Sequence, residues 1–103
     1  MSNKKILEHV LERKLVNAVK KIGGLCLKLT NYKGIPDRLI LFNGMVVFVE
    51  LKQEGKYMRI EQEMWERILE KKGFEHFLID NEAGIDRLVS SLTQGKSEGK
   101  DLY

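Results

Sequence analysis

The sequence predicts an α/β domain in which a mixed four-stranded sheet is flanked by helices. Apolar residues recur at helical spacing near both ends of the chain. In the middle, two apolar runs flank Asn43-Gly44, a pair that is typical of a tight hairpin turn. A helical stretch follows the hairpin and leads to a last apolar strand, which therefore joins the sheet after a crossover. We expect a single domain over residues 1–93 and a loose tail over 94–103.

The elements are expected in the order helix, three strands, helix, strand, helix. The first helix is predicted over residues 4–22, where apolar residues have the helical period, and Gly23-Gly24 ends it. The strands are predicted over 25–30, 38–42, 45–51 and 74–80, and the later helices over 59–72 and 82–92.

The predicted hairpin has a defined register. If Asn43-Gly44 is a two-residue turn, Phe42 faces Met45, and counting outward brings Asp37 opposite Glu50. Opposed residues share a face of the sheet, and Lys52 shares it too because it lies two residues beyond Glu50. A bulge in the turn would shift this register by one residue and separate the two carboxylates.

Two opposed carboxylates at a strand end indicate a cation site. Like charges repel each other, and a divalent ion removes that cost. Oxygen ligands suit Mg²⁺ or Mn²⁺. The alternative is a solvated hairpin end at which Lys52 only pairs with Glu50. The apolar run from Met45 to Val49 predicts a strand buried on both faces, which favours the metal site.

The basic residues are unevenly distributed. Residues 1–33 carry eight Lys and Arg against two Glu, whereas the whole chain has a net charge of +3. This fits contact with a phosphate backbone, although a solvated Lys-rich helix gives the same pattern. Lys33, in a Tyr-Lys-Gly loop, and Arg59, at a helix start, are candidate phosphate contacts.

One cysteine, Cys26, excludes an intramolecular disulfide and indicates a reducing compartment. The chain shows no signal-peptide pattern and no membrane-spanning apolar run. We therefore expect a cytoplasmic protein without a membrane partner.

The motif residues resemble the VRR-NUC (virus-type replication-repair nuclease) family of the PD-(D/E)xK nuclease superfamily. The resemblance covers about residues 8–80 and includes Gly23-Gly24, Lys28, the run Gly34-Ile35-Pro36-Asp37-Arg38-Leu39, the run Phe48-Val49-Glu50-Leu51-Lys52, and Gln62. It implies a restriction-endonuclease-like core of the order αβββαβ with an added helix. It also implies a DNA nuclease that uses Mg²⁺ or Mn²⁺.

The resemblance assigns roles around the metal. Asp37 and Glu50 would hold the ion, and the carbonyl of Leu51 would add a ligand. Lys52 would position or deprotonate the attacking water, or offset charge at the phosphate. Gln62 counts among the active-site motifs of the family.

The first helix is expected to supply a further glutamate. VRR-NUC spacing points to Glu8, whereas the similar helix of archaeal Holliday-junction resolvases points to Glu12, and both stay open. The resemblance also places Lys28 near DNA, with a solvent-facing strand lysine as the alternative, and Arg38 is a further candidate DNA contact.

The function implied is structure-specific cleavage of branched DNA, such as Holliday junctions, by a homodimer. Small VRR-NUC proteins are similar to phage or prophage products, so a bacterial host cell is the expected location. The alternatives are a flap- or restriction-like nuclease, a non-catalytic nucleic-acid-binding domain and a plain interaction module.

Overall fold

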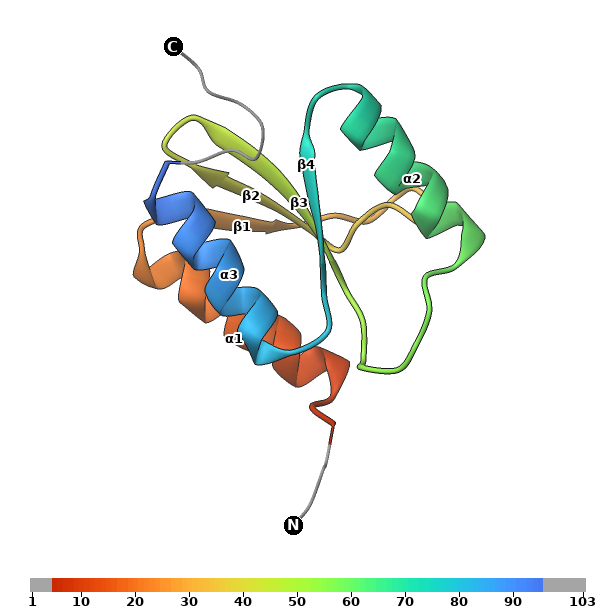
Figure 1. The fold of residues 1–103 in the computed structure, drawn as a ribbon, viewed down its shortest axis with the longest axis horizontal. Helices are drawn as coiled ribbons and strands as arrows, with labels where there is room; N and C mark the ends of the chain where they lie inside the picture. Colours follow the sequence, from red (N-terminus) through yellow and green to blue (C-terminus); the bar gives the residue numbers. More distant parts are fainter. Residues whose placement is uncertain (1–4, 96–103) are drawn as a thin grey trace.

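The computed structural model describes residues 5–95, and Figure 1 shows the arrangement of their helices and strands. The elements are α1 (Glu8–Lys21), β1 (Leu25–Lys28), β2 (Arg38–Phe42), β3 (Met45–Leu51), α2 (Ile60–Lys71), β4 (Glu75–Ile79) and α3 (Glu82–Thr93). Their order is the expected one. Of the tail predicted over 94–103, residues 96–103 lie outside the described part of the chain.

The four strands form one mixed sheet in the order β1-β2-β3-β4. β1, β2 and β3 are antiparallel neighbours, and β4 pairs in parallel with β3 after the α2 crossover. The predicted fold class is therefore confirmed.

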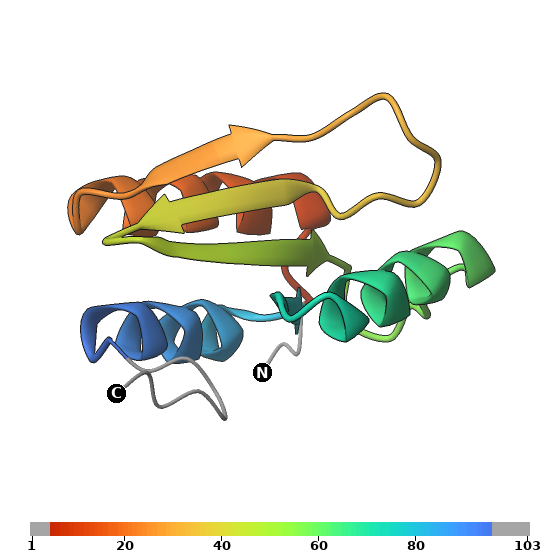
Figure 2. The ribbon, with the colours of Figure 1, turned by 90° about the horizontal axis from the view of Figure 1, so that it is seen from above.

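The helices lie on both sides of the sheet. Figure 1 shows α1 and α3 side by side on one side and α2 on the other, and Figure 2 shows the same layers from above. Alternation along β3 sends Val47, Val49 and Leu51 into the core with α1 and α3. Leu11 and Leu15 of α1 are fully buried there, and each such side chain stabilises the fold by about 1.5–3 kcal/mol.

Some predicted boundaries are wrong by a few residues. α1 begins at Glu8, not at residue 4, because the Leu7 carbonyl accepts the first helical bonds from the N–H groups of Val10 and Leu11. β1 ends at Lys28 rather than at residue 30, shortly before Asn31 turns the chain with φ of 75°. α2, β4 and α3 differ from the predicted ranges by one residue at each changed end.

The hairpin turn has the predicted geometry. Asn43 and Gly44 have φ of 49° and 79°, as a two-residue turn with two positive φ values requires. The ladder pairs Phe42 with Met45 and continues to Arg38 opposite Val49, without a bulge. Asp37 lies one residue before β2, and Glu50 lies one residue beyond the last pair. The predicted register is therefore confirmed up to the residue next to each carboxylate.

Candidate active site

Glu50 is a buried carboxylate near the end of β3. Its side chain lies on the α2 side of the sheet and the residue is 2% exposed. Oε2 accepts a hydrogen bond of 2.5 Å from Nε2 of Gln62, whereas the buried Oε1 has no hydrogen-bond partner among residues 5–95. Burial, with the negative charge of Asp37 as the second cause, raises the pKa of Glu50 to about 8. An oxygen that is buried and unpartnered is a suitable ligand for a cation.

Asp37 lies beside Glu50 and is bound to the same strand. Its Oδ2 accepts a hydrogen bond of 2.8 Å from the backbone N–H of Leu51. Burial raises the pKa of the Asp37 carboxyl, and the Leu51 hydrogen bond only partly offsets this. Both carboxyls therefore have pKa values above their ordinary values, with burial as the main cause at each.

Lys52 follows β3 directly and acts on both carboxyls. Its positive charge lowers the pKa of Glu50 and of Asp37, although burial outweighs it at each. The backbone N–H of Lys52 donates to the carbonyl of Ile79 at 3.0 Å, so β4 holds this residue in place. The structure thus brings together the two carboxylates and the ammonium group that the hairpin register predicts.

Gln62 connects the start of α2 to Glu50. Its Oε1 accepts a hydrogen bond of 2.7 Å from the N–H of Arg59, the N-cap residue, while its Nε2 donates to Glu50. Gln62 is 7% exposed. Its residue type and helical position alone suggest a surface glutamine, and only the family resemblance placed it at the site.

Glu12 lies in an ion-pair cluster between α1 and the first two strands. Its Oε2 accepts from Nζ of Lys28 at 2.7 Å and from Nε of Arg38 at 2.8 Å. Arg38 also donates to the carbonyl of Cys26 at 3.1 Å. Burial raises the pKa of Glu12, but the hydrogen bonds and charges of both cations outweigh it, and the net shift is downward. Glu12, Lys28 and Arg38 therefore satisfy one another.

The Glu12 cluster lies on the opposite face of the sheet from Glu50. Lys28 pairs with Arg38, and Arg38 pairs with Val49, which points into the core beneath α1. Glu8, one turn earlier on α1, is exposed, and its negative charge contributes to the raised pKa of Glu50. Among residues 5–95, Glu8 forms no ion pair, and of the two candidate glutamates it is the one with an electrostatic effect on Glu50.

The described residues do not contain a complete metal cage of side chains. Within residues 5–95, no group of three or more His, Cys, Asp or Glu side chains is close enough to hold a metal ion. Asp37 and Glu50 are two carboxylates, and the unpartnered Oε1 of Glu50 fits a cation ligand. A bound ion would need its other ligands from backbone carbonyls, water or substrate.

The loop before Asp37 is held against α2, a contact that sequence reasoning missed. A Cβ on Gly34 would lie 2.5 Å from Cβ of Glu61, so only glycine fits this approach. The indole N–H of Trp65 donates to the carbonyl of Lys33 at 3.1 Å, and the ring of Tyr32 lies 5.9 Å from that of Trp65. Gly34, two residues before Pro36, was the available signal, because a glycine can mark a close backbone approach.

The two remaining candidate phosphate contacts are accessible. The Lys33 side chain is 77% exposed and forms an ion pair of 3.4 Å with Glu61. Arg59 is exposed at the N-terminus of α2, and its positive charge lowers the pKa of Glu50 against the effect of burial. Lys33 pairs with Glu61 and Arg59 is the N-cap of α2, so both residues lie next to the first turn of the helix that carries Gln62.

Comparison with known proteins agrees with this geometry. No family model matches the chain. A solved structure described as "VRR_NUC domain" superposes with a TM-score of 0.75 and 26% sequence identity, covering 81% of this chain and 94% of that one. The chain is also 44% identical over 54 residues to a protein named "Putative nuclease p44" of Acyrthosiphon pisum secondary endosymbiont phage 1.

The match to the phage protein is partial. It covers 50% of this chain and 58% of the phage protein. Within the described residues, no helix has the length and apolar character needed to cross a membrane. The superposition extends over nearly the whole VRR_NUC domain, and the motif residues meet at one end of the sheet. The chain therefore has the fold of a VRR_NUC domain, and both comparisons support its resemblance to the VRR-NUC nucleases.

Proposed function

We propose that the protein is a metal-dependent endonuclease that hydrolyses phosphodiester bonds in DNA. The observation that carries this proposal is the buried Glu50, which has one unpartnered oxygen and lies beside Asp37 and Lys52. A fold needs no such arrangement for stability, because a buried carboxylate with a second carboxylate beside it is costly. The VRR_NUC match supports the same class of activity.

Asp37 and Glu50 would hold Mg²⁺ or Mn²⁺, with the Leu51 carbonyl and Glu8 as further candidate ligands. The ion, when bound, lowers the pKa of a coordinated water and stabilises negative charge on the phosphate. We assign Glu8 rather than Glu12 to this role because Glu12 is already bound by two cations. Gln62 holds the Glu50 carboxylate in place through Oε2 and leaves Oε1 free.

Lys52 would act on the reacting groups. Its ammonium group sits near both carboxylates, where it can position the attacking water or offset charge on the phosphate. Lys33 and Arg59 would contact neighbouring phosphates. Lys28 and Arg38, by contrast, bind Glu12, and their role in DNA contact would be secondary to holding α1 on the sheet.

The substrate we propose is branched DNA, cut by a homodimer. A two-fold dimer carries two symmetric active sites, which suits paired cuts across a four-way junction. The α2 side of the sheet supports this state, because Leu25 and Leu27 of β1 are 58% and 42% exposed there. A second copy that covers these leucines would remove an apolar surface from water.

Cleavage of a DNA panel tests the activity. Four-way junctions, flaps and plain duplex are incubated with Mg²⁺ or Mn²⁺, with Lys52→Ala and Glu50→Gln beside the wild type. Lys71→Ala, in the last turn of α2, is a matched control for loss of a lysine. We expect junction cleavage by the wild type and the control but not by the two site variants. Equal cleavage by Glu50→Gln would refute the assignment.

Sedimentation at several protein concentrations tests the dimer. Leu27→Glu places a charge on the apolar face, and we expect it to shift the protein towards monomer. Lys20→Glu, at an exposed position of α1, is the control for an added negative charge. A wild-type protein that stays monomeric at high concentration would exclude the dimer but leave the nuclease assignment standing.

A further inference from the structure

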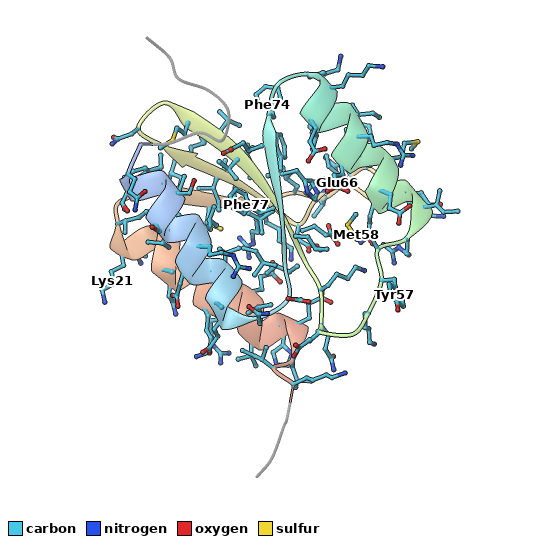
Figure 3. All side chains as sticks on the ribbon, in the orientation of Figure 1. Lys21, Tyr57, Met58, Glu66, Phe74 and Phe77 are labelled. Carbon is cyan, nitrogen blue, oxygen red and sulfur yellow. The ribbon has the colours of Figure 1, made fainter. Side chains whose placement is uncertain are left out.

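Residues 56–60, which lead from β3 into the first residue of α2, present apolar side chains to solvent. Tyr57 is 90% exposed and Ile60 is 77% exposed, the two most exposed of the large apolar residues in the described chain. Figure 3 shows Met58 pointing towards the strands and Tyr57 pointing away from them. Tyr57 belongs to neither of the two ring pairs recorded among residues 5–95. Core packing therefore does not explain this aromatic ring.

Basic residues flank the exposed apolar side chains. Lys56 directly precedes Tyr57, and Arg59 directly precedes Ile60, and both are exposed. Alternation of basic and apolar side chains on one exposed segment is complementary to single-stranded nucleic acid, in which phosphates alternate with unstacked bases. An apolar protein partner would gain little from the two charges.

The same segment is coupled to the candidate active site. The backbone N–H of Arg59 donates to Gln62, and Gln62 donates to Glu50. A short turn over residues 53–55 connects the segment to Lys52, whose charge acts on both carboxylates. A nucleotide bound along residues 56–60 would therefore be adjacent to a phosphate at the active site.

We propose that Tyr57 stacks on an unpaired base at a DNA branch point, with Lys56 and Arg59 holding the flanking phosphates and Ile60 extending the apolar contact. This inference rests on the proposed nuclease function and specifies the substrate further. A base in intact duplex is covered by its neighbours on both sides, whereas a branch point interrupts the continuous stack, so a base there is unstacked at lower cost and can stack on an aromatic ring. The segment thus gives the enzyme a means of preferring branched DNA over duplex.

The test measures binding of a four-way junction and of a matched duplex by fluorescence anisotropy, with Ca²⁺ in place of Mg²⁺. We compare the wild type with Tyr57→Ala and Tyr57→Trp. One stacked base contributes enough that its loss should weaken junction binding by roughly tenfold. Tyr57→Trp should bind like the wild type because it keeps a ring, and duplex binding should change little in any variant.

A second readout reports stacking directly. The junction carries 2-aminopurine at the branch point, and we expect the wild type to quench its fluorescence and Tyr57→Ala to lose that quenching. Lys21→Ala, at the far end of the molecule in Figure 3, is the control for Lys56→Ala. Of these two lysine variants, Lys56→Ala should weaken junction binding and Lys21→Ala should not.

The outcomes separate this inference from the proposed function. A wild type that cuts junctions, together with a Tyr57→Ala variant that binds and quenches as the wild type does, overturns the stacking role alone. A wild type that neither binds nor cuts any DNA overturns both. If Tyr57→Ala shifts the protein to monomer, and the dimer that remains binds the junction as tightly as the wild type does, residues 56–60 are a contact between protein copies. That result would also overturn the stacking role.

Discussion

Replacement of Glu50 by glutamine should make the metal-free protein more stable at neutral and alkaline pH. Glu50 has a folded-state pKa of about 8 against an ordinary value of 4.5. Between these two values the folded protein keeps a proton that the unfolded chain releases, so the free energy of unfolding falls as pH rises. Below pH 4.5 both states are protonated and Glu50 has no such effect.

The size of the effect follows from the width of this window. Each pH unit between 4.5 and 8 lowers the free energy of unfolding by about 1.4 kcal/mol. Glu50 should therefore destabilise the folded state by roughly 3 kcal/mol at pH 7 relative to pH 4.5. Above pH 8 the cost levels off near 5 kcal/mol by the same reasoning. Glutamine does not titrate, and its amide oxygen can still accept the hydrogen bond from Gln62.

Urea denaturation in EDTA at pH 5, 6, 7 and 8 measures this difference. We expect the free energy of unfolding of Glu50→Gln to exceed that of the wild type by an amount that grows with pH. Glu63→Gln, an exposed glutamate of α2, is the control and should follow the wild type at every pH. Parallel profiles for Glu50→Gln and the wild type would refute the raised pKa.

Mg²⁺ adds an independent part to the same experiment. An ion bound by Asp37 and Glu50 in the folded state alone stabilises it, by about 2.7 kcal/mol at an ion concentration one hundred times the Kd. We expect this gain in the wild type and its loss in Glu50→Gln. An equal gain in both proteins would place the ion elsewhere.

Three further predictions concern the surroundings of the site. In urea denaturation, Gly34→Ala should lower the free energy of unfolding by about 3 kcal/mol, because the residue has a positive φ and the new Cβ would clash with Glu61. Gly44→Ala also has a positive φ but its Cβ would meet no neighbour, so it should lower the free energy of unfolding by only about 1–2 kcal/mol. Glu12→Gln should lower the free energy of unfolding by about 2 kcal/mol, because Glu12 binds Lys28 and Arg38. Glu8→Gln should instead lower the rate of DNA cleavage, and the opposite result would make Glu12 the active-site glutamate and Glu8 the structural one. Burial lowers the pKa of His76, so the free energy of unfolding should fall as pH drops below 6.5, and His76→Gln should remove this dependence; an unchanged slope would contradict it.

Most of the fold followed from local signals in the sequence. The Asn43-Gly44 turn determined the register, because a two-residue loop leaves one way to pair the flanking strands. The helix periodicity placed α1 and α2 well, but it did not place the start of α1. Ile6 and Leu7 continue the apolar pattern, and the chain nevertheless begins its helix at Glu8.

The candidate site was only partly accessible from sequence. The proximity of Asp37 to Glu50 follows from the hairpin register. The hydrogen bond from Gln62 to Glu50 instead depends on where α2 packs, which no local pattern encodes. The roles of Glu12 and Arg38 were hidden for the same reason. Their ion pair joins α1 to β2 across 26 residues of sequence, and it forms only when the helix lies on the sheet.

The run from Gly34 to Arg38 combines positioning and chemistry in five residues. Gly34 allows the loop to touch α2, and the buried Pro36 restricts the backbone just before Asp37. Arg38 is anchored on the opposite face by Glu12 and by the carbonyl of Cys26. Asp37 is thus fixed from α2 on one side and from α1 on the other, and its carboxylate is bound to β3. Because a catalytic group must be held within a fraction of an ångström, a motif that fixes the backbone on both sides of its aspartate is what metal-dependent cleavage at this site would require.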